Sequence, residues 1–117
     1  MLLLRLIQAG FWLSVAGLTT ASLLPVDMLP PQTFDIWDKA QHAGGFAWLA
    51  FWGLVGYPAR PGRLALWLLV LGGAIELAQA ATGWRYGEWS DWLADAVGIA
   101  AGAALWWPLR HHTPGRA

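Results

Sequence analysis

The residues of this chain that could do chemistry are one of its three histidines and a group of acidic and amide side chains. They form short rows at the spacing of a helix face, because steps of three and four residues return to one side of a helix. The rows are Asp38 and His42, then Glu76 and Gln79, then Asp91 and Asp95. A histidine among carboxylates is an acid/base set, in which His42 or Glu76 would be the general base.

Two other interpretations of these rows stay open. The same side chains could hydrogen-bond to one another and do no more than fix the register of the helices. They could also bind a divalent cation, but His111 and His112 lie far along the chain and no HExxH or comparable ligand spacing occurs. We therefore expect no metal and no cofactor.

The composition indicates that the elements carrying these rows lie in lipid. Of 117 residues, 57% are hydrophobic and 12% are charged, whereas a typical soluble domain has about 25% charged residues. Four apolar runs, 6–24, 38–57, 64–82 and 89–107, approach the roughly 17–25 residues that a bilayer requires. We expect an all-α integral membrane protein, with residues 1–117 forming one four-helix transmembrane bundle and 108–117 a cytoplasmic tail.

A cleavable signal peptide is the alternative for the first run. We favour a spanning helix, because the run is longer than the roughly 7–15 residues of a signal core. It also carries a row of small residues suited to helix packing, namely Gly10, Ser14, Gly17 and Ala21. The chain contains no cysteine, which excludes disulfides and thiolate chemistry from it.

In the last three expected helices the polar rows continue into small residues. These are Gly45, Gly53 and Gly56 after His42, Gly72 before Glu76, and Gly98 and Gly102 after Asp95. Small residues permit close approach of helices, so these faces should turn into the bundle together with their polar side chains. At about 1.5 Å per residue, His42 lies roughly 6 Å inside its outer helix end, and Glu76 and Asp95 roughly 9 Å. The three side chains could therefore meet at one level.

The basic residues are sorted toward one side of the expected bundle. The termini and the second loop carry Arg5, Arg60, Arg63, Arg110 and Arg116, whereas the first and third loops carry only Lys39 and Arg85. An excess of basic residues marks the cytoplasmic side, so both termini should be cytoplasmic and all seven carboxylates external or open to the outside. The flat guanidinium of Arg85 suits either a neighbouring carboxylate or an anionic headgroup.

Three separated motifs in the sequence resemble those of a known family. Asp38, Lys39 and His42, then Glu76 and Gln79, then Arg85, Asp91 and Gly98 are similar, in order, to the signature of VanZ-like membrane proteins. The resemblance covers residues 38–102. The chain departs from the family at Asp95, where the family often has Asn. The family is associated with low-level resistance to glycopeptide antibiotics, particularly teicoplanin, so the resemblance implies a cell-envelope role in the bacterial cytoplasmic membrane.

The leading hypothesis is an outward-facing polar pocket that binds an envelope lipid headgroup or a lipid-linked precursor. Its expected residues are Asp38, Lys39, His42, Glu76, Gln79, Arg85, Asp91 and Asp95. One alternative is a hydrolase or transferase that uses the same pocket on a lipid-linked substrate. Another is a small partner subunit of a membrane complex, and a homo- or hetero-oligomer is compatible with either. The few scattered basic residues give no support to nucleic-acid binding.

Overall fold

The computed structural model is helical throughout the residues that it describes, which are 1–25, 35–83 and 89–112, with side chains described from residue 39 in the second range. Its elements are α1 (Leu2–Leu23), α2 (Asp35–Gly56), α3 (Pro61–Thr82), α4 (Trp89–Trp106) and a short 3-10 helix, η2 (Trp107–Leu109), that extends α4. No strand occurs in these ranges. The all-helical fold class expected from the composition is confirmed for this part of the chain.

Three helices begin a few residues before the apolar runs that predicted them. The reason is that a helix continues through polar residues that a hydrophobicity count leaves out, and Arg5 and Asp35 both lie in first turns. α3 begins at Pro61, because a proline in the first turn has no N–H that would need a partner. It ends at Thr82, and the next residue, Gly83, has a φ of 82° in the left-handed region that glycine adopts without strain.

Three of the four helices are long and apolar enough to cross a membrane, and they are α1, α3 and α4 together with η2. α2 does not meet this criterion, because Lys39, Gln41 and His42 lower the hydropathy of its first half. Length and composition thus support three of the four spans expected from the sequence. α2 is nevertheless as long as α1 and α3, with 22 residues, or about 33 Å of helix.

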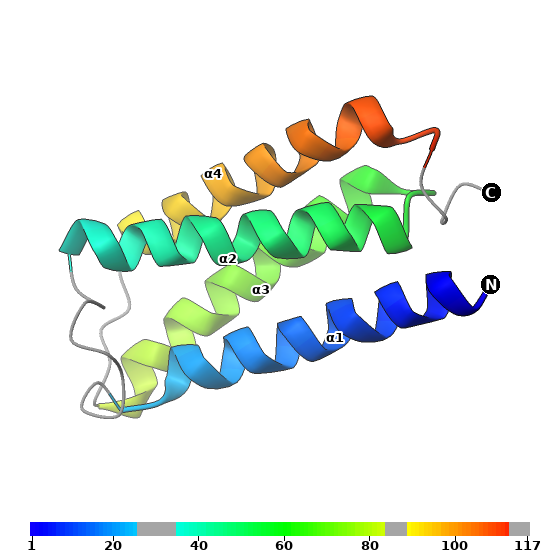
Figure 1. The fold of residues 1–117 in the computed structure, drawn as a ribbon. Coiled ribbons are helices and arrows are strands. Elements are labelled where there is room, and N and C mark those ends of the chain that lie inside the picture. The colour runs from blue at the N-terminus through cyan, green and yellow to red at the C-terminus, as the bar shows by residue number, and fades with distance from the viewer. Residues whose placement is uncertain (26–34, 84–88, 113–117) are drawn as a thin grey trace.

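The four helices form an elongated bundle with extents of 45 × 24 × 22 Å (Figure 1). α1 and α4 lie on opposite sides of the α2–α3 pair and make no backbone contact with each other. The start of α1, the α2–α3 connection and the end of η2 lie at one end of the bundle, here called the terminal end. The starts of α2 and α4 and the end of α3 lie at the other end, here called the polar end.

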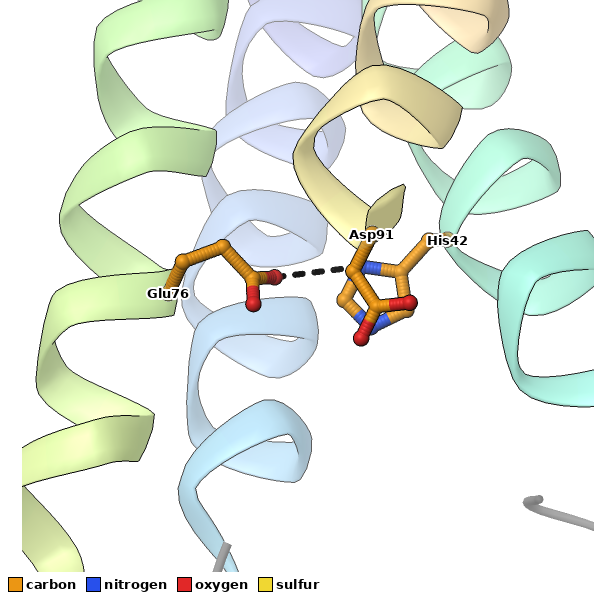
Figure 2. Close-up of side chains that lie close together, drawn as sticks. All are labelled: His42, Glu76 and Asp91. Atoms are coloured by element: carbon orange, nitrogen blue, oxygen red, sulfur yellow. Dashed lines mark ion pairs between the residues drawn. The ribbon is translucent and has the colours of Figure 1, made fainter. Parts of the chain in front are cut away.

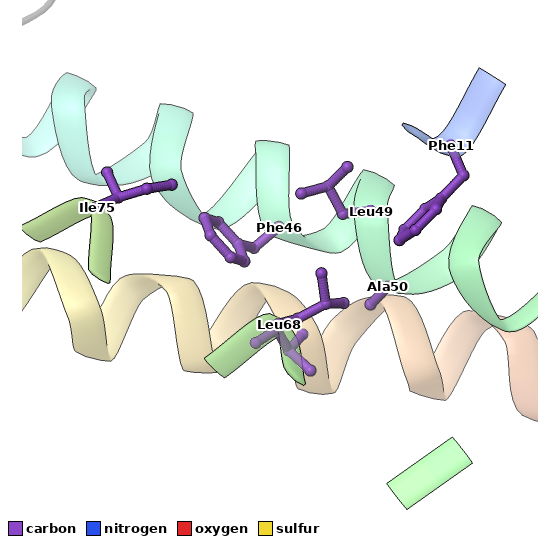
Figure 3. Packing of buried hydrophobic residues seen from close by; sticks show 7 residues of the cluster. Phe11, Phe46, Leu49, Ala50, Leu68 and Ile75 are labelled. Atoms are coloured by element: carbon purple, nitrogen blue, oxygen red, sulfur yellow. The ribbon is translucent and has the colours of Figure 1, made fainter. Parts of the chain in front are cut away.

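α2 and α4 are the most closely packed pair. Gly98 and Gly102 of α4 lie directly against the carbonyl oxygens of Ala43 and Ala47 in α2. Lipid gives little hydrophobic drive for helices to associate, so close packing of small residues is a main source of stability between them. A core of seven buried apolar residues fills the middle of the bundle (Figure 3), namely Phe11, Phe46, Leu49, Ala50, Leu68, Ile75 and Ile99.

α1 is the peripheral helix, and Phe11 is its only buried residue. The prediction that Gly10, Ser14, Gly17 and Ala21 form a packing row is wrong for three of the four residues, whereas Ser14 is half-buried and accepts a 3.1 Å hydrogen bond from Trp48 Nε1 of α2. Gly10, Gly17 and Ala21 are exposed, and a Cβ added at Gly10 or Gly17 would meet nothing within 4 Å. Spacing identifies residues that share a face, but a helix that contacts only two neighbours leaves other faces outside the bundle.

Candidate functional site

The polar side chains from α2, α3 and α4 meet at the polar end of the bundle. His42 comes from the second turn of α2, Glu76 from the second half of α3, and Asp91 and Asp95 from the first half of α4. Figure 2 shows His42, Glu76 and Asp91 pointing toward one another from their three helices. The convergence expected from helical spacing and depth is therefore present.

His42 is the centre of this group. Its Nδ1 lies 2.9 Å from Asp95 Oδ1, a hydrogen-bond distance, and 3.8 Å from Glu76 Oε1. The exposed fractions are 8% for His42, 8% for Glu76 and 0% for Asp95. A carboxylate that holds one ring nitrogen of a histidine orients the imidazole and selects its tautomer. The His42–Asp95 pair has this arrangement.

Lys39 and Asp91 form a second ion pair beside the first. Lys39 Nζ lies 3.4 Å from Asp91 Oδ1, and the Asp91 side chain is almost fully buried while that of Lys39 is about one third exposed. Lys39 therefore places a positive charge at the edge of a group with three carboxylates, Glu76, Asp91 and Asp95. Since isolated buried ions cost several kcal/mol each, such a group persists only when its members are paired.

Gly72 makes room for the deepest carboxylate. A Cβ at this position would lie 2.8 Å from Asp95 Oδ2, so any larger residue at position 72 would displace the Asp95 side chain. Beside it, Trp92 Nε1 donates a 3.0 Å hydrogen bond to the Leu69 carbonyl and ties α4 to α3. The sequence indicated the small row that contains Gly72, but no pattern in it pointed to the Trp92 bond.

Gln79 is fully buried and makes a contact with α1 that the sequence did not predict. Its Nε2 donates a 2.8 Å hydrogen bond to the carbonyl oxygen of Ser22, in the last turn of α1. Carbonyls in a last turn have no partner within their own helix, so Gln79 caps α1 as well as standing one turn from Glu76. No pattern in the sequence pointed to Ser22, because a backbone carbonyl carries no residue-type preference.

Two of the expected site residues cannot be placed in the group by their side chains. Arg85 lies outside the described residues, and Asp38 is in the first turn of α2, where side chains are not described. The described members of the expected set are Lys39, His42, Glu76, Gln79, Asp91 and Asp95. Five of them form the two ion-paired groups, here called the polar cluster: Lys39, His42, Glu76, Asp91 and Asp95.

The donor set of the polar cluster is also compatible with a cation. His42, Glu76 and Asp91 each offer one ligand atom, and these atoms lie within 4.8 Å of one another. Imidazole and carboxylate together suit zinc or manganese. Lys39 opposes such binding, since its ammonium already lies against Asp91. The expectation of no metal stays a prediction.

Comparison of the chain with models of protein families, with curated proteins and with solved structures gave no match.

Proposed function

We propose that this chain is a four-span protein of the bacterial cytoplasmic membrane whose polar cluster binds an envelope lipid headgroup or a lipid-linked precursor. The observation that carries the proposal is the burial of His42, Glu76, Asp91 and Asp95 at one end of an otherwise apolar bundle. Ionisable groups within membrane helices are costly, and they mark functional sites more often than structural ones. The resemblance of residues 38–102 to VanZ-like proteins points to the same role.

The arrangement of the bundle supports an outward-facing position for the polar cluster. Arg5, Arg60, Arg63 and Arg110 are at the terminal end, and an excess of basic residues marks the cytoplasmic side. α2 completes the fourth span in this proposal, because it runs the length of the bundle (Figure 1). Its buried His42 lies against Glu76 of α3 and Asp95 of α4. The polar cluster then lies at the level of headgroups in the outer leaflet.

The chemistry of the polar cluster suits a headgroup with hydroxyl, amide or amine donors. Glu76 and Asp91 supply carboxylate acceptors, and Lys39 supplies a cation for a phosphate. A hydrolase or transferase is the second candidate, favoured by the 2.9 Å contact between His42 Nδ1 and Asp95 Oδ1. In that case the carboxylate orients the imidazole, and His42 or Glu76 acts as the general base toward a lipid-linked substrate.

Lipid retained during purification tests the binding proposal. The protein is extracted in mild detergent, and its bound lipids are identified by mass spectrometry for wild type, Glu76→Gln and Leu77→Ala. Leu77 is the matched control, because it adjoins Glu76 and is 76% exposed on the outer face of α3. We expect one polar lipid species to be enriched on wild type and on Leu77→Ala, and to fall about tenfold on Glu76→Gln, a loss of about 1.4 kcal/mol.

An identical lipid profile for wild type and a folded Glu76→Gln variant would overturn the proposal. Whole-cell lipids from the same strains separate the two candidate functions. A binding protein leaves the chemical structures of the lipids unchanged, whereas an enzyme produces a species that is missing from cells carrying the Glu76→Gln variant.

A further inference from the structure

A second candidate site lies at the terminal end of the bundle, away from the polar cluster. It is a groove of about 510 Å³ between the first half of α1, the α2–α3 connection and the start of α3. This volume is within the range of roughly 300–1,000 Å³ that is typical of ligand sites. Its wall is aromatic, with Phe11, Trp12, Tyr57 and Trp67, and its rim carries Arg60 and Arg63.

The aromatic wall of the groove is fixed by internal contacts. Trp12 Nε1 donates a 2.9 Å hydrogen bond to the Tyr57 hydroxyl, and ring centroids are 5.1 Å apart for Phe11 and Trp12 and 5.3 Å apart for Trp12 and Trp67. Gln8 Nε2 donates a 3.0 Å hydrogen bond to the Gly56 carbonyl. Because these polar groups are satisfied within the protein, the groove presents mainly apolar surface, which suits an acyl chain.

The rim of the groove is positive. Arg60 and Arg63 are exposed, and none of the seven carboxylates of the chain lies within residues 1–26 or 39–75. Arg60 is also the N-cap residue of α3 and makes no side-chain capping bond. The N–H groups of a first helical turn and the positive end of the helix dipole favour an anion. Two arginines that line the groove therefore lie at this helix start.

We propose that this groove binds an anionic phospholipid, with the phosphate on Arg60, Arg63 and the first turn of α3 and an acyl chain along the aromatic wall. Basic pockets between helices are a recurring way to hold anionic headgroups. The charge of the rim selects the headgroup, while the apolar wall accepts the chain of any lipid. The site is separate from the polar cluster, so it does not depend on the function proposed above.

Native mass spectrometry in mild detergent tests the groove with two probes, dioleoyl phosphatidylglycerol and dioleoyl phosphatidylcholine. We expect the wild-type protein to retain the anionic lipid about tenfold better than the zwitterionic one, because each nearby basic residue strengthens binding of anionic lipid. The Arg60→Gln, Arg63→Gln double variant should lose this preference and bind the two lipids equally. Both arginines are exposed, so the variant should fold as the wild type does.

The control is the Arg5→Gln, Arg110→Gln double variant, which has the same net charge and changes arginines outside the groove. It should keep the wild-type preference. Equal retention of both lipids by the wild type would overturn the proposal. It would also be overturned if the control lost the preference as fully as the groove variant, since the effect would then be that of net charge alone.

Discussion

At the scale of single residues, the contact between His42 and Asp95 is the most constrained feature of the molecule. Asp95 is fully buried and lies against Gly72 on one side and His42 on the other. Removing one partner of a buried pair leaves the other without its hydrogen bond, and this costs more than the pair itself contributes. Shape and hydrogen bonding at position 95 can therefore be separated by two substitutions.

We expect Asp95→Leu to lower the free energy of unfolding by about 1–3 kcal/mol, because it leaves the His42 imidazole buried without its partner. Asp95→Asn should cost less, since the amide has nearly the same shape and can still donate to or accept from His42 Nδ1. Chemical unfolding in mild detergent, followed by tryptophan fluorescence, measures both. Equal losses for the two variants would mean that the hydrogen bond contributes nothing to stability.

The ion-paired side chains show which features of the site residue spacing can predict and which it cannot. Helical rows placed His42, Glu76 and Asp95 on inward faces, and a rise of about 1.5 Å per residue placed them at one depth. Neither consideration could identify the pairs. Lys39 of α2 pairs with Asp91 of α4, and Gln79 of α3 binds a backbone carbonyl of α1. Which side chains become partners depends on the packing angles between helices, and the spacing of residues along one helix does not encode those angles.

At the scale of elements, the α2–α4 interface holds the polar cluster in register. Gly98 is at its tightest point, where a Cβ would lie 3.0 Å from the Ala43 Cα and still closer to the Ala43 carbonyl. Neither atom belongs to a flexible side chain, so the two helices themselves would have to separate. Any separation here also moves Asp95 away from His42, since Gly98 is one turn from Asp95.

We expect Gly98→Ala to destabilise the protein by about 1–3 kcal/mol, the usual cost of overpacking, and to weaken whatever binding the polar cluster performs. The matched control is Gly17→Ala, because a Cβ at Gly17 would meet nothing within 4 Å. It should be neutral or stabilising by up to about 1 kcal/mol, since alanine favours helix more than glycine does. Unfolding midpoints of the two variants in the same detergent check the difference, which would be absent if α2 and α4 were loosely packed.

At the scale of the whole molecule, the composition was sufficient to predict an all-helical membrane protein and the approximate extent of its helices. It was insufficient to predict which faces lie outside the bundle. α1 carries small residues on an exposed face, whereas in α4 Gly98 and Gly102 lie against α2. The difference arises because α1 packs only on α2 and α3. α2, the least apolar helix, carries two buried glycines, Gly53 and Gly56, and the buried His42 on faces that its neighbours cover.

The proposed four-span arrangement predicts on which side of the membrane each end of α2 and α3 lies. Ala40 and Ala81 lie toward the polar end and Ala59 toward the terminal end, and all three are exposed. The chain has no cysteine, so each can be replaced singly by Cys and probed with a membrane-impermeant maleimide on spheroplasts of a Gram-negative host. We expect Ala40→Cys and Ala81→Cys to be labelled from outside, and Ala59→Cys only after lysis, because α2 and α3 each cross the bilayer once. Labelling of Ala40→Cys and Ala59→Cys from the same side would show that α2 does not cross. Labelling of Ala59→Cys alone from outside would place the polar cluster on the cytoplasmic side.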